Sequence, residues 1–362
     1  MATTTSMVGP NADLDFYFTS VNAAYLRALA GQNRAFYTQI AQVPTAGKMT
    51  TERVGMPMAN GMTATGTRVR FPIRLAPSRP RVWPQGQPRP IEQFSAIELV
   101  LDLKRWCPPA KRESWVVWQN DIANLIKEQL PDMMDRSIIL WDEVLAEAFA
   151  RNDIWRPDQL PFFSPASAPH PANPAKLSLP GGQSTFYNDI PVTGIDVPEM
   201  RRLLGILTKQ PGPDGVTLDT DEVEVWVLAP DDDFGFQLKQ VFQEGIAAQA
   251  VGANAAASVG NSLKGAAKVQ VWKVLSSTIA QPTFGGNLQD RGKVGYMLAV
   301  PRGEGRPVAV VPSIHPTAYY TGTNGSDHLR ASMGDVEFGW DAFGEAILAI
   351  AQRAIRFIVN PV

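Results

Sequence analysis

Few side chains in this 362-residue sequence could do acid–base or metal chemistry. The sequence holds three histidines, His170, His315 and His328, and a single cysteine, Cys107. Histidine is the usual general base and a common metal ligand near neutral pH, but none of the three has the HExxH spacing of a zinc site. His170 and His315 each precede a proline, which favours a position in a loop. We therefore expect no catalytic and no metal-binding histidine.

The lone cysteine excludes an internal disulfide and a cysteine-cluster metal site. Cys107 follows Trp106 and is interpreted as a small buried residue rather than a reactive thiol. The stretch 285–293, GGNLQDRGK, superficially resembles a phosphate loop, but its glycine spacing is one residue too long. Val294 also stands where Ser or Thr should hold magnesium. We expect no cofactor, and we do not expect an enzyme.

The consecutive aspartates Asp231, Asp232 and Asp233 could hold a hard cation through oxygen ligands. They stand directly before an amphipathic helical pattern, where carboxylates cap free amide groups and meet the positive end of the helix dipole. We therefore favour capping over a metal site. All eight charged residues between Lys209 and Lys239 are acidic, which predicts an acidic surface that a basic partner could cover.

A basic segment runs from Lys48 to Ser95, with eight basic residues against two acidic ones and with seven prolines. Within it, TRVRFPIRL (67–75) alternates between polar and apolar residues, which predicts an extended two-stranded excursion. An isolated ribbon is marginal in water, so we expect it to gain order by lying on a neighbour. Docking on another protein is favoured over phosphate binding and over a solvated basic loop. Its candidate contact residues are Arg68, Arg70, Arg74, Arg79 and Arg81.

The elements around these residues follow from hydrophobic spacing and turn signals. One long helix is expected over 114–150, kinked or restarted near Pro131, because proline removes a helical hydrogen bond. Shorter helices are expected within 13–41, over 197–207 and directly after Asp233. Strands are expected over 97–103, 222–228 and 269–275, and as a pair over 296–300 and 307–311. The segment 342–359 fits a helix or a buried strand, and we favour a strand for its end. This mixture predicts an α+β protein.

Composition narrows the function further. Hydrophobic residues make up 44% and charged residues 19% of the chain, which is typical of a globular protein. A formal net charge of −2 excludes electrostatic binding of nucleic acid by the whole molecule. The N-terminus lacks a signal-peptide pattern, and no apolar run reaches the roughly 18 residues of a membrane helix. We expect a soluble protein, made in the cytoplasm, with no membrane contact.

Several weak motifs follow one another in a fixed order. They are IAQVPTAG (40–47), ELVLDLKR (98–105), PDMMDRSIILWDEVLAEAF (131–149), FFSPASAPHPANP (162–174), GGQSTFYND (181–189), LLGILTKQPGPDGVTL (203–218) and VWVLAPDDD (225–233). In order and spacing the series resembles the Mu-like phage major head subunit family, whose members have the HK-97-like capsid fold of tailed phages. The resemblance covers most of the chain.

The resemblance implies an α+β subunit with the HK-97-like major capsid fold. Its expected parts are an N-terminal arm (1–47), an extended loop (48–95), a peripheral domain (96–190) with a spine helix (114–150), an axial domain (191–335) and a return to the peripheral domain (336–362). The implied function is a major capsid (head) protein that self-assembles into pentamers and hexamers. These close as an icosahedral shell around the double-stranded DNA of a tailed phage or prophage.

The resemblance also implies partners and a location. The partners are further copies of the chain, a separate scaffold protein, a portal, decoration proteins and, weakly and non-specifically, packaged DNA. The expected location is the virion, after assembly in the host cytoplasm. Asp231, Asp232 and Asp233 join the five arginines as candidate inter-subunit contacts.

The chain departs from some relatives in ways that sharpen these expectations. Some proteins with this fold join subunits covalently through a lysine in the extended loop, but here Lys48 is the only lysine of that segment, so we expect non-covalent contacts. Only 47 residues precede the loop, too few for a cleaved scaffold domain. Two alternatives stay open: an encapsulin-like compartment shell with an enzyme as cargo, and a soluble hydrolase that uses His170 or His315 with Asp231 to Asp233.

Overall fold

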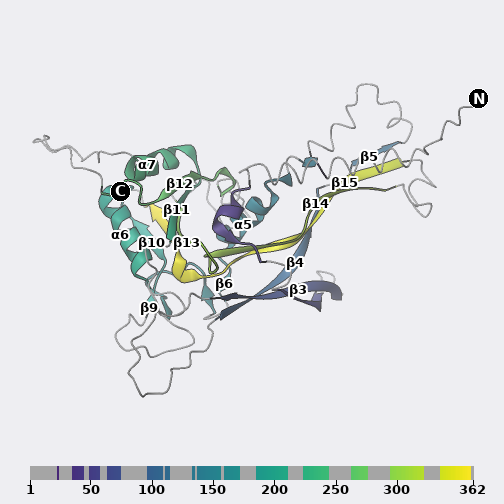
Figure 1. Cartoon of the computed structure of the whole chain (residues 1–362), viewed down its shortest axis with the longest axis horizontal. Helices are drawn as coiled ribbons and strands as arrows, with labels where there is room; N and C mark the ends of the chain where they lie inside the picture. Colours follow the sequence, from purple (N-terminus) through teal and green to yellow (C-terminus); the bar gives the residue numbers. More distant parts are fainter. Residues whose placement is uncertain are drawn as a thin grey trace, which may run out of the picture.

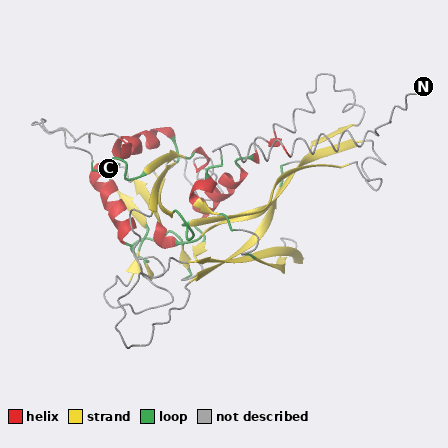
Figure 2. Cartoon of the chain, in the orientation of Figure 1, coloured by secondary structure: helices red, strands yellow, loops and turns green. Residues whose placement is uncertain are grey.

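The chain consists of two β-sheets with helices packed between and beside them (Figures 1 and 2). The computed structural model describes residues 23, 35–44, 49–57, 63–74, 96–108, 111–114, 133–134, 137–155, 159–171, 185–210, 223–243, 262–275, 294–321 and 335–359. This mixture of sheets and helices confirms the predicted α+β class. None of the described helices is long and apolar enough to cross a membrane.

The larger sheet has seven strands in the order β1-β14-β15-β4-β3-β2, with β5 paired to β15 off this path. Their bounds are β1 Ala41–Gln42, β2 Thr50–Pro57, β3 Thr63–Arg74, β4 Ala96–Trp106, β5 Lys111–Ser114, β14 Val308–Thr321 and β15 Asp335–Leu348. The pairs are antiparallel except β1 with β14, which is parallel.

Strand β4 belongs to two layers of this sheet. Residues 96–103 pair with β3, whereas residues 104–106 pair with β15. The β2–β3 ribbon therefore lies across one face of the β14–β15 pair (Figure 1). Every second residue of β4 points into the space between the layers, as the pleat of a strand requires. The apolar cluster there contains Val69, Phe71, Leu99, Leu101, Leu103, Ala309, Val311, Ala349 and Ile350.

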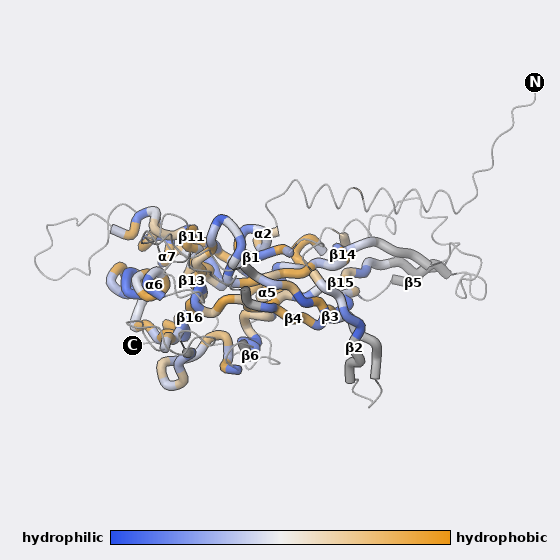
Figure 3. Tube along the Cα trace, turned by 60° about the horizontal axis from the view of Figure 1, so that its bottom comes forward, coloured by the Kyte–Doolittle hydropathy of each residue, from blue (hydrophilic) through white to orange (hydrophobic). Residues whose placement is uncertain are grey.

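The smaller sheet has five strands in the order β10-β16-β13-β11-β12. Their bounds are β10 Asp189–Val192, β16 Ala354–Val359, β13 Val294–Pro301, β11 Val223–Ala229 and β12 Lys268–Val271. Helices α6 (Val197–Lys209) and α7 (Asp232–Gln243) cover one face of this sheet. Helix α6 buries Met200, Leu203 and Leu207 at helical spacing, and its outer surface is hydrophilic (Figure 3).

Helix α5 (Leu140–Arg151) packs between the two sheets, and most of its residues are buried. Rings from α5, from residues 162–163 and from β13 meet there, with Phe149 4.8 Å from Tyr296 between ring centroids. Small elements complete the junction: α2 (Tyr37–Ile40), β6 (Ile154–Trp155), β7 (Leu160–Pro161), β8 (His170–Pro171), β9 (Thr185–Phe186) and the 3₁₀ turn η5 (Ala351–Arg353).

Several expected elements are confirmed. The strands expected over 97–103 and 222–228 are β4 and β11, and the helices expected over 197–207 and after Asp233 are α6 and α7. The favoured strand at the C-terminus is also confirmed, because 342–359 contains the end of β15 and all of β16.

The single helix expected over 114–150 is wrong at its start and is interrupted before Leu140, whereas its expected end agrees with α5, which ends at Arg151. Ser114 closes strand β5, and α5 begins only at Leu140, after a turn at Ile138 and Ile139. The Ser137 hydroxyl donates to the Met134 carbonyl at 2.6 Å, a local bond that competes with regular helix. Residues 115–132 lie outside the described part of the chain.

The expected strand pair over 296–300 and 307–311 is wrong. Both segments are strands, but β13 pairs with β11 and β16, whereas β14 pairs with β15 and β1. Residues 302–307 carry the chain from one sheet to the other. In the same way β14, from the expected axial segment 191–335, lies in the seven-stranded sheet, and β16, from 336–362, lies in the five-stranded one.

The expectation of a buried Cys107 is also wrong. Cys107 is exposed, because β4 ends at Trp106 and the chain leaves the sheet there. Trp106 stays half-buried instead and donates its indole N–H to the Gly344 carbonyl at 3.0 Å.

Candidate functional site

The β2–β3 ribbon carries the arginines that the sequence singles out, and it has two unlike faces. Val69 and Phe71 of β3 are buried against Val311 and Ile350 of the same chain. This part of the ribbon therefore packs on its own chain, whereas the sequence led us to expect that it lies on a neighbour. The alternation of TRVRFPIRL places the arginines between these residues on the opposite face.

That opposite face is a ladder of ion pairs across β2, β3 and β4. Arg68 donates two hydrogen bonds to Asp102, at 2.6 Å and 3.1 Å, in the forked geometry typical of arginine. This hydrogen-bonded contact raises the pKa of Arg68. Arg70 lies 3.1 Å from Glu52 and 3.9 Å from Glu98. Arg68 and Arg70 are therefore already paired with carboxylates of the same chain.

The other three candidate arginines are Arg74, Arg79 and Arg81. Arg74 is the last residue of β3, and Arg79 and Arg81 lie outside the described residues. In the described part of the chain β2 is the outer strand of the ribbon, and its residues 50–53 are exposed. An outer strand presents backbone donors and acceptors that another strand can pair with.

Of the three consecutive aspartates, Asp231 has the capping role that the sequence predicts. Its carboxylate accepts the Phe234 backbone N–H at 2.8 Å and so caps the start of α7. Asp232 forms an ion pair with Lys273 at 2.8 Å, and no described group of acidic, histidine or cysteine side chains is arranged to hold a metal ion. The preference for capping over metal binding therefore agrees with the geometry of Asp231.

The acidic surface expected between Lys209 and Lys239 is partly neutralised by the chain itself. Glu224 of β11 forms an ion pair with Lys268 of β12 at 2.8 Å, and this bond is the main reason why the pKa of Glu224 is lowered. The Lys268 ammonium group also lies 5.0 Å from the centre of the Trp226 ring.

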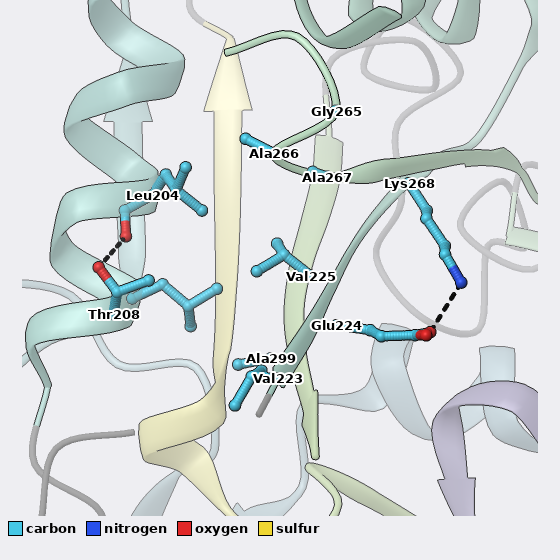
Figure 4. Close-up of a pocket in the computed structure, with 11 residues that line it drawn as sticks. Leu204, Thr208, Val223, Glu224, Val225, Gly265, Ala266, Ala267, Lys268 and Ala299 are labelled. Carbon is cyan, nitrogen blue, oxygen red and sulfur yellow. Dashed lines mark hydrogen bonds and ion pairs between the residues drawn. The ribbon is translucent and has the colours of Figure 1, made fainter. Parts of the chain in front are cut away.

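A cavity of about 380 Å³ lies beside this ion pair (Figure 4). Its lining is mostly apolar and comes from α6, β11, β13 and the segment before β12: Leu204, Leu207, Thr208, Val223, Glu224, Val225, Gly265, Ala266, Ala267, Lys268 and Ala299. The Thr208 hydroxyl donates to the Leu204 carbonyl at 2.9 Å, and the charged pair is internally satisfied. The lining therefore offers apolar contact rather than acid–base chemistry.

The histidines considered for catalysis are placed differently from the loops expected for them. His170 lies in β8, is fully buried, and has its Nε2 3.1 Å from the Phe162 carbonyl oxygen. His315 lies in β14, where burial lowers its pKa. His328 and the glycine-rich stretch 285–293 lie outside the described residues.

Sequence reasoning missed a buried asparagine that joins three segments. The Asn188 side chain accepts the Ser164 N–H at 2.8 Å and donates to the carbonyls of Phe162 and Ala351, at 2.9 Å and 3.1 Å. His170 reaches the same Phe162 carbonyl, because β8 pairs with β9 two residues before Asn188. The motifs FFSPASAPHPANP and GGQSTFYND, noted only for their order, were the available signal.

Comparisons with known proteins give structural likenesses only. No protein-family model matches the chain, and no curated protein matches it. The mature capsid of bacteriophage PhiM1 is 10% identical over 82% of both chains, with a TM-score of 0.41. The procapsid of bacteriophage JBD30 is 12% identical over 98% of this chain and 77% of that one, with a TM-score of 0.44. The capsid of cyanophage P-SCSP1u is 13% identical over 89% and 86%, with a TM-score of 0.47.

Proposed function

We propose that this chain is a major capsid (head) protein, which assembles into the pentamers and hexamers of an icosahedral shell around the double-stranded DNA of a tailed phage or prophage. One observation carries the proposal: β14 and β15, of 14 residues each, run far past α5 (Figure 1). Among the described residues their outer end pairs only with the four-residue β5. A strand pair that extends beyond the packed body of the chain offers a neighbouring copy a surface on which to pack.

The ribbon offers a second contact between copies. The outer side of β2 can accept a strand from an adjacent subunit, because pairing there satisfies backbone groups. Arg68 and Arg70 already have partners within the chain. We therefore place the contact with the acidic surface of a neighbour on Arg74, Arg79 and Arg81.

Membership of the Mu-like head family is the finer part of the proposal. The motif residues Phe162, His170 and Asn188, spread over the sequence, meet at one buried point. Motif residues that contact one another in the fold are needed for its structure. That requirement would keep the order and spacing of these segments the same among members of the family.

We assign the peripheral and axial parts of the subunit to the two sheets. The seven-stranded sheet with α5 would be the peripheral part, the ribbon its extended loop, and the five-stranded sheet with α6 and α7 the axial part. A separate scaffold protein, a portal and decoration proteins would complete the particle in the host cytoplasm. With a net charge of −2 the shell would contact packaged DNA only weakly.

The proposal is tested by expressing the chain and imaging the purified product by negative-stain electron microscopy, with sedimentation to measure its mass. Closed shells or ring-shaped oligomers are expected. Charge reversal at Arg74, Arg79 and Arg81 together should leave a folded subunit that no longer assembles, while Gly205→Ala, on the surface of α6, should assemble normally. A protein that stays monomeric at high concentration would overturn the proposal.

Particles purified from a natural host, where any other components are also present, separate the alternatives. Nuclease-protected double-stranded DNA and a vertex for a tail support the phage head, whereas an enzyme enclosed without DNA supports an encapsulin-like compartment. A monomer that loses a hydrolytic activity when His170 is changed would support the hydrolase instead.

A further inference from the structure

Residues 35–44 enter the core of the fold through a buried carboxylate on α5. The Asp142 side chain accepts the backbone N–H groups of Phe36, at 3.1 Å, and of Tyr37, at 2.6 Å. Asp142 is only 2% exposed, and these two bonds hold the first turn of α2. Each carboxylate oxygen accepts one of the two amide groups, so the geometry uses both oxygens.

The other end of α2 is held by an arginine. One guanidinium nitrogen of Arg306, Nη1, donates to the carbonyls of Thr38, Gln39 and Ala41, at 2.9, 3.1 and 2.9 Å. Two residues of β1 then pair with Val308 and Ala309 of β14. The segment is therefore fixed at a few discrete points, with an anion at its start and a cation at its end, which is also the favourable order for the helix dipole.

Apolar side chains from the segment fill the space between these points. The Phe36 ring lies 5.3 Å from Trp226 and 5.6 Å from Trp272, both edge-to-face, and Tyr37 and Ile40 are buried. Fully burying side chains of this size contributes about 1.5–3 kcal/mol each, so the docked state is the ground state. Any release is a minor opening event, which hydrogen exchange can detect.

The charged groups around Asp142 do not offset the free-energy cost of burying its carboxylate. Glu143, its neighbour on α5, adds a second negative charge, and Glu345 of β15 is buried and paired with a lysine. His315 of β14 lies edge-to-face with the adjacent Trp141 and has its own pKa lowered by burial. Arg306 contacts the far end of α2. Within the described residues no cation forms an ion pair with Asp142.

We propose that residues 35–44 are a latch, and that the charge state of the Asp142 carboxyl group controls how readily this latch opens from α5 and β14. The latch lies within one chain, so it does not depend on the proposed role in a shell.

The direction in which pH changes the opening of the latch follows from proton linkage. With the latch closed, burial raises the pKa of Asp142 to about 7, although the two amide bonds act in the opposite direction. With the latch open, the carboxyl group meets water and its pKa returns to about 4. The closed state thus binds the proton more tightly and is favoured most below pH 4. Between pH 4 and 7 the opening constant rises by up to about tenfold per pH unit, and it is constant above that window.

Hydrogen–deuterium exchange with mass spectrometry tests this on the full chain between pH 5 and 8.5, corrected for intrinsic exchange with an unstructured reference peptide. In the wild-type protein, protection of peptides covering 35–44 should fall several-fold to tenfold per pH unit up to about pH 7 and then level off. Peptides from α6, which packs in the other apolar cluster, should show no such dependence. Protection of 35–44 that is the same at pH 5 and pH 7 would overturn the proposal.

Three variants complete the test. Asp142→Asn keeps an acceptor for one amide group but cannot titrate, so its protection should not depend on pH. Glu143→Gln removes the carboxyl group of the exposed neighbouring residue, which is not one of the groups bonded to Phe36 or Tyr37, and should keep the dependence. Arg306→Met should lower protection by the same factor at every pH, and it serves if Asp142→Asn does not fold. Loss of the pH dependence in Glu143→Gln, or its survival in Asp142→Asn, would refute the role of Asp142.

Discussion

Gly344 lies where β15 meets α5, and replacing it with alanine probes the packing there directly. A β-carbon at this position would approach ring atoms of Trp141 and the backbone carbonyl oxygen of Val311 closer than 3.0 Å. The Trp141 ring is fully buried and cannot swing away, and the carbonyl belongs to β14, so backbone must move. Overpacking of this kind costs typically 1–3 kcal/mol, and we expect about 3 kcal/mol for Gly344→Ala because a strand has to shift.

Gly205→Ala is the matched control, because the same methyl group is added inside helix α6. No atom lies within 4 Å of the added β-carbon, and alanine favours the helix by about 0.5–1 kcal/mol. Urea unfolding followed by tryptophan fluorescence gives both free energies of unfolding, provided the urea dependence is unchanged. The two substitutions should differ in sign. A Gly344→Ala protein within 0.5 kcal/mol of wild type would refute the packing described for α5 and β15.

Three further predictions concern buried or capping polar groups, and the same urea measurement checks each. Asn188→Leu should destabilise the protein by about 2 kcal/mol, because it leaves the buried Ser164 N–H without an acceptor and removes one of two partners from each of the Phe162 and Ala351 carbonyls. Gln352→Leu should stabilise it by about 1 kcal/mol, since both amide atoms of this 1% exposed side chain lack hydrogen-bond partners among the described residues; a destabilised variant would contradict this. Asp231→Ala should cost about 1 kcal/mol through the lost cap of α7, and added Ca²⁺ or Mg²⁺ should leave the Tm of the wild type unchanged. A rise in Tm with either ion that Asp231→Ala abolishes would instead support a metal site.

Local patterns in the sequence predict an element when its type and its buried face follow from its own residues alone. The alternation in β3 and β4 and the helical spacing in α6 identify both the element and its buried face, because one side of each is apolar. Strand β13 and the first four residues of β14 are continuous apolar runs, which indicate burial but carry no information about pairing. They are adjacent in sequence yet enter different sheets, and only the tertiary structure decides this.

The same distinction applies to the candidate site. Asp231 is predicted correctly because a cap involves residues three positions apart. The partners of Arg68 and Arg70 could not be predicted, since Asp102 and Glu98 meet them only through the register of β3 with β4. The burial of His170 depends in the same way on β8 pairing with β9 across a long separation in sequence.

The shared strand β4 gives the subunit a mechanical property. Antiparallel hydrogen bonds lie perpendicular to the strands, so tension along β4 loads all of its bonds together instead of breaking them one by one. A pull on the far end of the β2–β3 ribbon therefore reaches β15 as shear along residues 104–106, where Arg105 is paired with Asp341 and Lys104 with Glu345. The ribbon is thus anchored to β15 within the seven-stranded sheet, and force applied along β4 would load these pairs in shear rather than peel them apart one by one.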